Sequence, residues 1–188
     1  MNDTPRSVYR LGAEDGLLMA PMLILVALLF GASTYYTWLG LPAMVAAIGV
    51  PALAYWLLAR TYARQPELST FSALWLQGIC TFFFGSLIMA VVVYLAMRFM
   101  CPTFIVDQFN TVIAVYSQID EPAADTLVSV LQRALNEHQL PTPMDVTLEL
   151  VYIIVFTGSI LSMFLSLIIR RRGRNQRFPE PPKFNNDI

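Results

Sequence analysis

The side chains that could carry chemistry are few, because the long apolar stretches of this chain contain no Asp, Glu, Lys, Arg or His. Intramembrane metalloproteases and aspartyl proteases need metal ligands or paired carboxylates inside such stretches. A serine nucleophile needs a base, and the only histidine, His138, lies in a polar connection. We therefore predict no catalytic residue, no metal site and no cofactor, and a protein that is not an enzyme.

Small and hydroxylated side chains form two stripes at helical spacing. The first lies on the longest apolar stretch: Gly78, Thr81 and Gly85. The second lies near the end of the chain: Gly158, Ser162 and Ser166. Small residues let helix backbones approach closely in a membrane, and the neighbouring amide of Gln77 needs a partner on another helix. We predict that the two stripes pack together, with a substrate path between them as the alternative.

Charged side chains mark the ends of the apolar stretches. Arg98 and Glu149 fall at one boundary, where a charge must reach the lipid headgroups or a partner. Their simplest roles are snorkelling or a mutual salt bridge, and the sharper alternative is proton or ion coupling. A basic cluster follows the last stretch: Arg170, Arg171, Arg172 and Arg174. It is typical of a stop-transfer and orientation signal that also attracts anionic lipid.

Composition shows which elements must position these residues. The chain has 188 residues, of which 56% are hydrophobic and 13% charged, and its mean hydropathy is +0.58. The uncharged stretches cover residues 17–38, 41–59, 71–97 and 151–169. A bilayer core about 30 Å thick is crossed by about 20 helical residues. The sequence therefore predicts an all-α integral membrane protein, a single four-helix transmembrane bundle over residues 1–172.

The connections between the spans also have predicted structure. Ser69 or Thr70 can cap the third span, while Thr142, Pro143 and Asp145 resemble the start of the helix that contains the fourth. The polar loop 98–147 has apolar residues at helical spacing on both sides of a break at 120–122, which predicts two short amphipathic helices. Their apolar faces could lie on the membrane, close over the bundle or bind a partner, and we favour the first two.

The distribution of basic residues predicts the topology. Ten of the twelve Lys and Arg residues lie in the lead, in the connection 60–70 and after residue 169, whereas the loop 98–147 has two. The positive-inside rule then places both termini in the cytoplasm and the loop outside. Residues 1–16 read as a cytoplasmic stub, and the proline-containing tail 173–188 is predicted to be disordered. The expected location is a bacterial inner membrane.

Several short motifs, in order along the chain, are similar to those of a known family. They are Tyr9-Arg10-Leu11-Gly12, Phe71-Ser72-Ala73, the stretch from Phe99 to Ile105, Gly158, and Arg170-Arg171-Arg172. Over roughly residues 8–172 the chain resembles the bacterial four-span membrane proteins catalogued as domain of unknown function 4199. The resemblance supplies no activity and implies an accessory role in envelope glycolipid work.

These observations predict a non-enzymatic membrane protein that serves as an assembly or accessory subunit of envelope machinery. The alternative is a small transporter or channel whose path is lined by the third and fourth spans. The expected partners are the lipid bilayer and either another membrane protein or further copies of this chain. Nothing in the sequence indicates a nucleic acid or identifies a small-molecule substrate.

Overall fold

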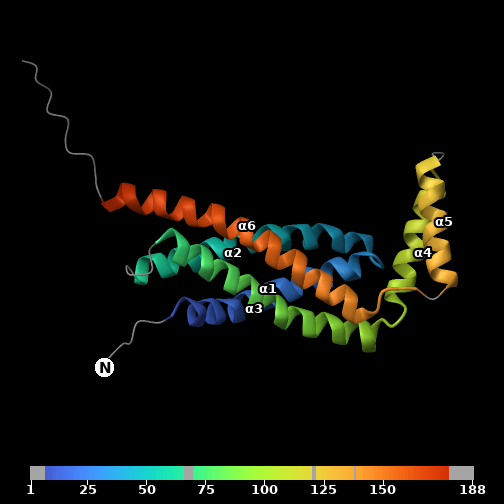
Figure 1. Ribbon diagram of the computed structural model, residues 1–188, viewed down its shortest axis with the longest axis horizontal. Coiled ribbons are helices and arrows are strands. Elements are labelled where there is room, and N and C mark those ends of the chain that lie inside the picture. The colour runs from blue at the N-terminus through green and yellow to red at the C-terminus, as the bar shows by residue number, and fades with distance from the viewer. Residues whose placement is uncertain (1–6, 66–69, 120–121, 138, 178–188) are drawn as a thin grey trace, which may run out of the picture.

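The computed structural model describes residues 7–65, 70–119, 122–137 and 139–177, which form helices and no strand (Figure 1). The elements in chain order are α1 (Val8–Ser33), the 3-10 turn η1 (Thr37–Leu39), α2 (Gly40–Arg64), α3 (Phe71–Leu95), the π-helical turn η3 (Ala96–Met100), α4 (Phe104–Tyr116), α5 (Pro122–Asn136) and α6 (Pro143–Arg177). The predicted all-α fold is confirmed.

Four helical segments are long and apolar enough to cross a membrane. They are Val8–Ser33, Thr37–Arg64, Phe71–Met100 and Pro143–Arg172. In Figure 1 the start of α1, the end of α2, the start of α3 and the end of α6 lie at one end of the bundle, and α4 and α5 lie at the other. The predicted membrane-type bundle of four helices, with a helical loop between the third and fourth, is therefore confirmed.

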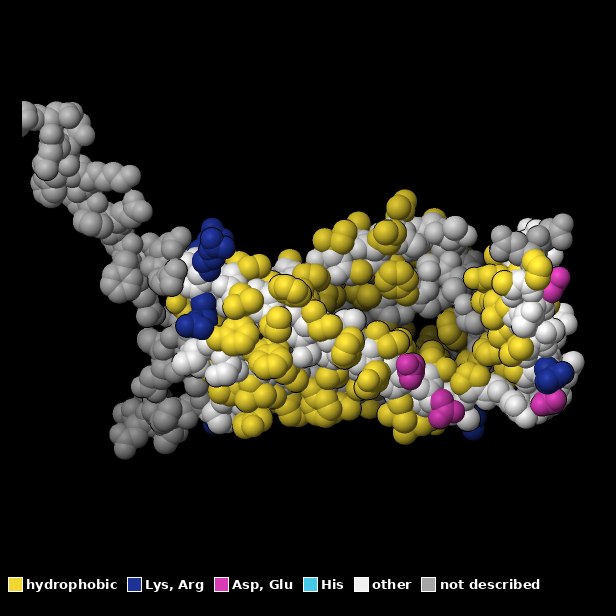
Figure 2. Space-filling model, turned by 45° about the horizontal axis from the view of Figure 1, so that its top comes forward, with side chains coloured by type: hydrophobic (Ala, Val, Ile, Leu, Met, Phe, Trp, Pro, Cys, Tyr) yellow, Lys and Arg dark blue, Asp and Glu magenta, His cyan; other side chains and the backbone are white. Residues whose placement is uncertain are grey.

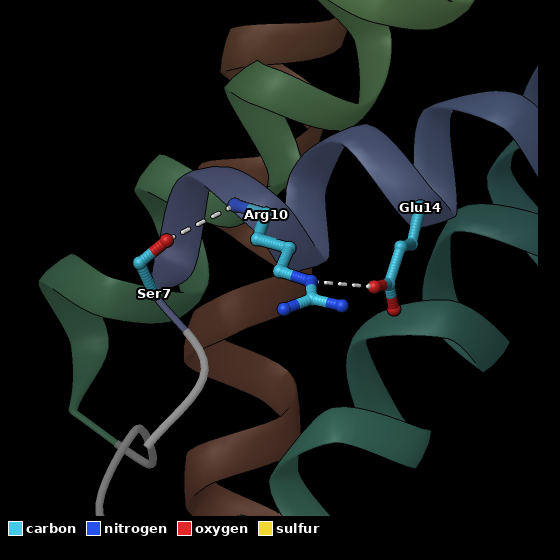
Figure 3. A network of polar contacts seen from close by, with 3 residues as sticks. All are labelled: Ser7, Arg10 and Glu14. Atoms are coloured by element: carbon cyan, nitrogen blue, oxygen red, sulfur yellow. Dashed lines mark hydrogen bonds and ion pairs between the residues drawn. The ribbon is translucent and has the colours of Figure 1, made fainter. Parts of the chain in front are cut away.

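Helix α1 is shifted towards the N-terminus relative to the predicted span 17–38. It begins at Val8, well before residue 17, and ends at Ser33, before residue 38. Ser7 caps the helix by accepting a hydrogen bond from the backbone N of Arg10 at 3.4 Å, and the Arg10 side chain pairs with Glu14 at 3.1 Å (Figure 3). A cap and an ion pair four residues apart both favour continued helix. The lead is thus not a stub outside the bundle, because much of it is the first part of a membrane-type helix.

Helix α3 is the centre of the bundle. It packs most extensively against α1 and α6, while α2 lies mainly against α1. Apolar side chains from these helices form the core, including Met19, Leu74, Phe82 and Met89. The indole Nε1 of Trp75 also donates a hydrogen bond to the backbone carbonyl of Ser159 at 3.1 Å, which ties α3 to α6.

The predicted helix starts are confirmed at two places. Thr70 caps α3 by accepting from the backbone N of Ala73 at 3.4 Å; Ser69 lies outside the described residues. At the start of α6, the backbone N of Thr142 donates to Asp145 Oδ2 at 2.8 Å, and the backbone N of Asp145 donates to Thr142 Oγ1 at 3.3 Å. This reciprocal pair satisfies amide groups that the first helical turn leaves unbonded.

Replacing Thr142 by alanine should lower the free energy of unfolding by about 1 kcal/mol, because the first turn of α6 loses its cap. The measurement is the unfolding midpoint in mild detergent. Thr126→Ala is the matched control, since the Thr126 hydroxyl only donates to the Pro122 carbonyl within α5. Equal midpoints for the two variants would contradict a stabilising role for the cap.

Helix α6 also extends further than the predicted span 151–169. It continues to Arg177, so the segment 173–177 is helical and the predicted disordered tail does not begin at 173. The run of basic residues does not stop the helix, since arginine is a good helix former. Residues 178–188 lie outside the described part of the chain.

The two helices predicted within the loop 98–147 are present, and they form a hairpin, α4 and α5, that stands off one end of the bundle (Figures 1 and 2). They pack against each other, and among the described residues no extensive contact joins either of them to a membrane-type helix. The hairpin therefore does not close over the bundle, which was one of its predicted positions.

Candidate functional site

Three helices meet at a buried polar cluster formed by Asp15 of α1, Thr61 of α2 and Gln77 of α3. The Gln77 side-chain Nε2 donates to Asp15 Oδ2 at 2.6 Å and to Thr61 Oγ1 at 2.8 Å. The exposed fractions are 7% for Asp15, 6% for Thr61 and 1% for Gln77. Gln77 therefore has the interhelical partners that its amide required, and they lie on α1 and α2.

Glycine residues bring α1 close enough to α3 for this contact. A β-carbon on Gly12 would overlap the side chain of Cys80 and lie 3.2 Å from the Gln77 carbonyl oxygen. One turn later, a β-carbon on Gly16 would lie 2.8 Å from the β-carbon of Phe84. The absence of side chains at Gly12 and Gly16 lets the two backbones touch, and Asp15 between them reaches the amide of Gln77.

A small hollow of about 160 Å³ opens beside the cluster, between α1 and the end of α2. Its lining consists of Leu11, Glu14, Asp15, Leu18, Arg60, Thr61, Arg64 and Gln65. The guanidinium of Arg60 lies 5.6 Å from the centre of the Trp56 ring, a cation–π contact that helps to hold it. The hollow thus combines two carboxylates with two guanidinium groups at the edge of the apolar part of the bundle.

The two stripes of small residues meet only in part. A β-carbon on Gly78 would overlap Ser162, and one on Gly158 would overlap the Phe82 ring, so these glycines lie in the contact between α3 and α6. Gly85 instead packs against Gly16, Met19 and Leu23 of α1.

The prediction that Gly85 meets the α6 stripe is therefore wrong. Thr81 also belongs to the α1 side, since its carbonyl oxygen lies 3.1 Å from the β-carbon position of Gly16. The physical reason is that α3 packs against both α1 and α6. Positions 78 and 85 point in nearly the same direction but lie about 10 Å apart along the helix axis, so a different neighbouring helix lies over each of them.

The hydroxyl groups of Thr81 and Ser166 are each bonded within their own helix. Thr81 Oγ1 donates to the Gln77 carbonyl at 2.9 Å, and Ser166 Oγ donates to the Ser162 carbonyl at 2.7 Å. Ser162 Oγ is buried without a hydrogen-bond partner among the described residues. Close packing rather than an open channel surrounds these side chains, since Ser162 and Ser166 are fully buried.

The boundary charges do not form a site together. Arg98 in η3 and Glu149 in α6 are both exposed, and the described residues show no ion pair between them. At the opposite end of the bundle Arg170, Arg171 and Arg172 are exposed on α6. Arg172 Nη1 donates to the Tyr55 hydroxyl of α2 at 3.4 Å, while the side chain of Arg174 lies outside the described part.

Sequence reasoning missed Asp15, although a signal was present. The buried positions of α1 recur at helical spacing and start in the charged lead: Leu11, Gly12, Asp15, Gly16, Met19, Ala20 and Leu23. A span that is bounded by the nearest charged residue begins at residue 17 and leaves Asp15 out. The helical spacing of the positions that pack against other helices includes Asp15 in the same helix. The acidic side chain of Asp15 is therefore buried within a membrane-type helix.

A comparison with known protein families identifies the family of the chain. The family model described as "Protein of unknown function (DUF4199)" matches residues 14–171. The chain belongs to the DUF4199 family. No curated protein and no solved structure matches it. The matched part of this DUF4199 protein contains all three members of the buried cluster, and the family description assigns no activity.

The hairpin of the DUF4199 protein has its own polar contacts. The Tyr35 hydroxyl, in the turn after α1, donates to Asp107 Oδ2 of α4 at 3.1 Å. Burial, and then this hydrogen bond, raises the pKa of Tyr35, so it remains a neutral donor at physiological pH.

A more open hollow of about 450 Å³ lies between α4 and α5, lined by Asn110, Ile113, Gln132, Leu135 and Asn136.

Proposed function

We propose that this DUF4199 protein is a non-enzymatic accessory subunit that holds another membrane protein through the hairpin of α4 and α5. The observation that carries the proposal is the apolar surface that the hairpin leaves exposed, separate from the membrane-type helices. Its exposed residues include Val112, Val115, Tyr116, Ile119, Leu127 and Val130. Side chains of this kind, outside the membrane-type helices and rimmed by polar residues, are typical of a protein interface.

Charge favours a protein partner over the lipid surface as the ligand of the hairpin. Within the described part of α4, α5 and the residue that follows, the acidic side chains Asp107, Asp125 and Glu137 outnumber the single basic Arg133. An acidic surface is repelled by anionic lipid headgroups. The partner that fits is a membrane protein whose surface beside the bilayer is apolar and basic.

The proposed orientation places the hairpin outside the cell and both termini in the cytoplasm of a bacterial inner membrane. The support is the charge distribution, because basic side chains gather at the end of the bundle opposite to the hairpin (Figure 2). Arg60, Arg64 and Arg172 belong to this end. The positive-inside rule associates such an end with the cytoplasm.

The packing favours this accessory role over the transporter alternative. A path between the third and fourth spans would need Thr81, Ser162 and Ser166 to face an open space, and these side chains are instead buried against neighbouring helices. Gln77 is likewise occupied by Asp15 and Thr61. The proposed non-enzymatic role has the same basis, since the polar groups of the bundle serve to join its helices.

A photo-crosslinking amino acid at Val130 should give a discrete protein adduct in native membranes, because the Val130 side chain is 58% exposed on the apolar face of the hairpin. The matched control is the same amino acid at Gln132, an exposed polar position of the same helix. The measurement is the adduct yield, with mass identification of the crosslinked chain.

The proposal expects an adduct with a second membrane protein at Val130 and a much weaker one at Gln132. Equal yields at both positions, or lipid adducts alone, would contradict a protein interface on this face. An adduct between two copies of the chain would show a homo-oligomer and would replace the accessory role.

A further inference from the structure

The hollow between α1 and α2 lies where lipid headgroups meet a membrane-type bundle. Arg60 and Arg64 belong to the last turns of α2, and Leu11 and Asp15 belong to the first turns of α1. Both helix ends lie at the end of the bundle that also carries the basic residues of α6 (Figures 1 and 2). A ligand in this hollow would therefore be at headgroup depth.

The lining carries charges of both signs, which selects the kind of ligand. Asp15 supplies a carboxylate, and Arg60 and Arg64 supply two guanidinium groups, while the Glu14 carboxylate is paired with Arg10. A ligand with only a negative charge would face the Asp15 carboxylate, and a ligand with only a positive charge would face the two arginines. A zwitterion with a phosphate and an ammonium group complements both, since guanidinium groups bind phosphate well and a carboxylate accepts N–H bonds from an ammonium.

The carboxylate of Asp15 has one oxygen available for such a contact. Oδ2 accepts the hydrogen bond from Gln77 at 2.6 Å. No described residue donates to Oδ1, and this oxygen is not among the side-chain atoms that are buried without a partner. Since Asp15 lines the hollow, the contact with Gln77 fixes the carboxylate and leaves its second oxygen accessible from the hollow.

Size and surroundings fit a small headgroup that remains attached to its acyl chains. The volume of about 160 Å³ corresponds to about five water molecules at roughly 30 Å³ each. Leu18, which is half exposed, continues the lining towards the apolar surface of the bundle. Acyl chains can therefore lie along α1 while the headgroup occupies the polar part.

We infer that this hollow binds the zwitterionic headgroup of a phosphoethanolamine lipid, with Arg60 and Arg64 on the phosphate and Asp15 on the ammonium group. This inference is independent of the proposed hairpin interface, because it concerns the opposite end of the bundle. It also explains why a carboxylate is retained within a membrane-type helix, where a charge is costly unless it has a partner.

The test compares three lipids added to the purified full-length protein in detergent. They are phosphatidylethanolamine, phosphatidylcholine and phosphatidylglycerol, and bound lipid is counted by native mass spectrometry. Phosphatidylcholine carries the positive charge without an N–H donor, and phosphatidylglycerol lacks the positive charge. Phosphatidylethanolamine should bind about tenfold more tightly than phosphatidylcholine, because phosphatidylcholine cannot donate the charge-assisted hydrogen bond to Asp15. Equal binding of the three lipids would overturn the inference.

Variants test the assignment of the two groups. Asp15→Asn keeps an acceptor for Gln77, so the cluster can still form, and it should remove the preference for phosphatidylethanolamine over phosphatidylcholine. Arg60→Gln should weaken the binding of both lipids, because both carry the phosphate that Arg60 contacts. Arg171→Gln is the matched control, because Arg171 is exposed at the same end of the bundle outside the hollow. An Asp15→Asn protein that folds and keeps the preference overturns the role of the carboxylate.

A competition experiment distinguishes a bound lipid from a bound soluble headgroup. Soluble phosphoethanolamine, added at the concentration of the lipid, should fail to displace bound phosphatidylethanolamine, because it lacks the acyl chains that lie along Leu18. Full displacement by the soluble compound would overturn the assignment to a lipid.

Discussion

Gly16→Leu should lower the free energy of unfolding by about 3 kcal/mol or more and separate α1 from α3. A β-carbon at this position would lie 2.8 Å from the β-carbon of Phe84, 3.1 Å from the Thr81 carbonyl oxygen and 3.2 Å from the backbone N of Gly85. Two of these three atoms are backbone atoms of α3, which cannot rotate away as a flexible side chain can. Overpacking of this kind costs most where neither side can adjust.

The measurement is the unfolding midpoint in mild detergent, together with protease resistance in membranes. Gly31→Leu is the matched control in the same helix, because a β-carbon on Gly31 would meet no atom within 4 Å. That variant should stay within about 1 kcal/mol of the parent, since leucine is a better helix former than glycine. Similar losses for the two variants would show that helix propensity, and not the contact with α3, decides the outcome.

The same reasoning applies to Gly85→Leu, with a different interface. A β-carbon there would lie 3.2 Å from the Gly16 carbonyl oxygen and 3.3 Å from the Leu23 side chain. Bulk at Gly85 should therefore disrupt the contact of α3 with α1, whereas bulk at Gly78 should disrupt its contact with Ser162 of α6.

Gln77→Leu should destabilise the bundle by about 2 kcal/mol, because it removes both hydrogen bonds of the buried cluster and leaves the Asp15 carboxylate without a donor. Interhelical hydrogen bonds in membranes are individually modest. The larger contribution comes from the buried acid that loses its partner. Unfolding midpoints in mild detergent provide the measurement.

A double-mutant cycle identifies this mechanism. Asp15→Leu combined with Gln77→Leu should be less destabilised than the sum of the two single changes, because removal of both partners leaves no unsatisfied acid. Thr81→Val is the control for a lost buried hydroxyl, and it should cost less than about 1 kcal/mol since Thr81 Oγ1 bonds only within α3. Additive single and double changes would contradict the coupling of Asp15 to Gln77.

Part of this architecture follows directly from the sequence. Uncharged stretches of sufficient length predict the membrane-type helices because lipid requires every backbone group to be bonded within a helix. The capping pair Thr142 and Asp145 is predictable for a similar reason, since a helix start is a local arrangement of a few neighbouring residues. The two helices of the loop are likewise predictable, because their apolar residues recur at the spacing of a helix.

Only the tertiary structure shows which neighbouring helix packs against each small or polar residue of α3. Sequence spacing places Gly78, Thr81 and Gly85 roughly on one stripe, and it does not say that α1 covers part of that stripe and α6 the rest. The partner of Gln77 could not be predicted either, because Asp15 lies 62 residues away in the chain, within the charged lead 1–16. Only the close approach of α1 to α3 at Gly12 and Gly16 makes that acid a buried member of the bundle.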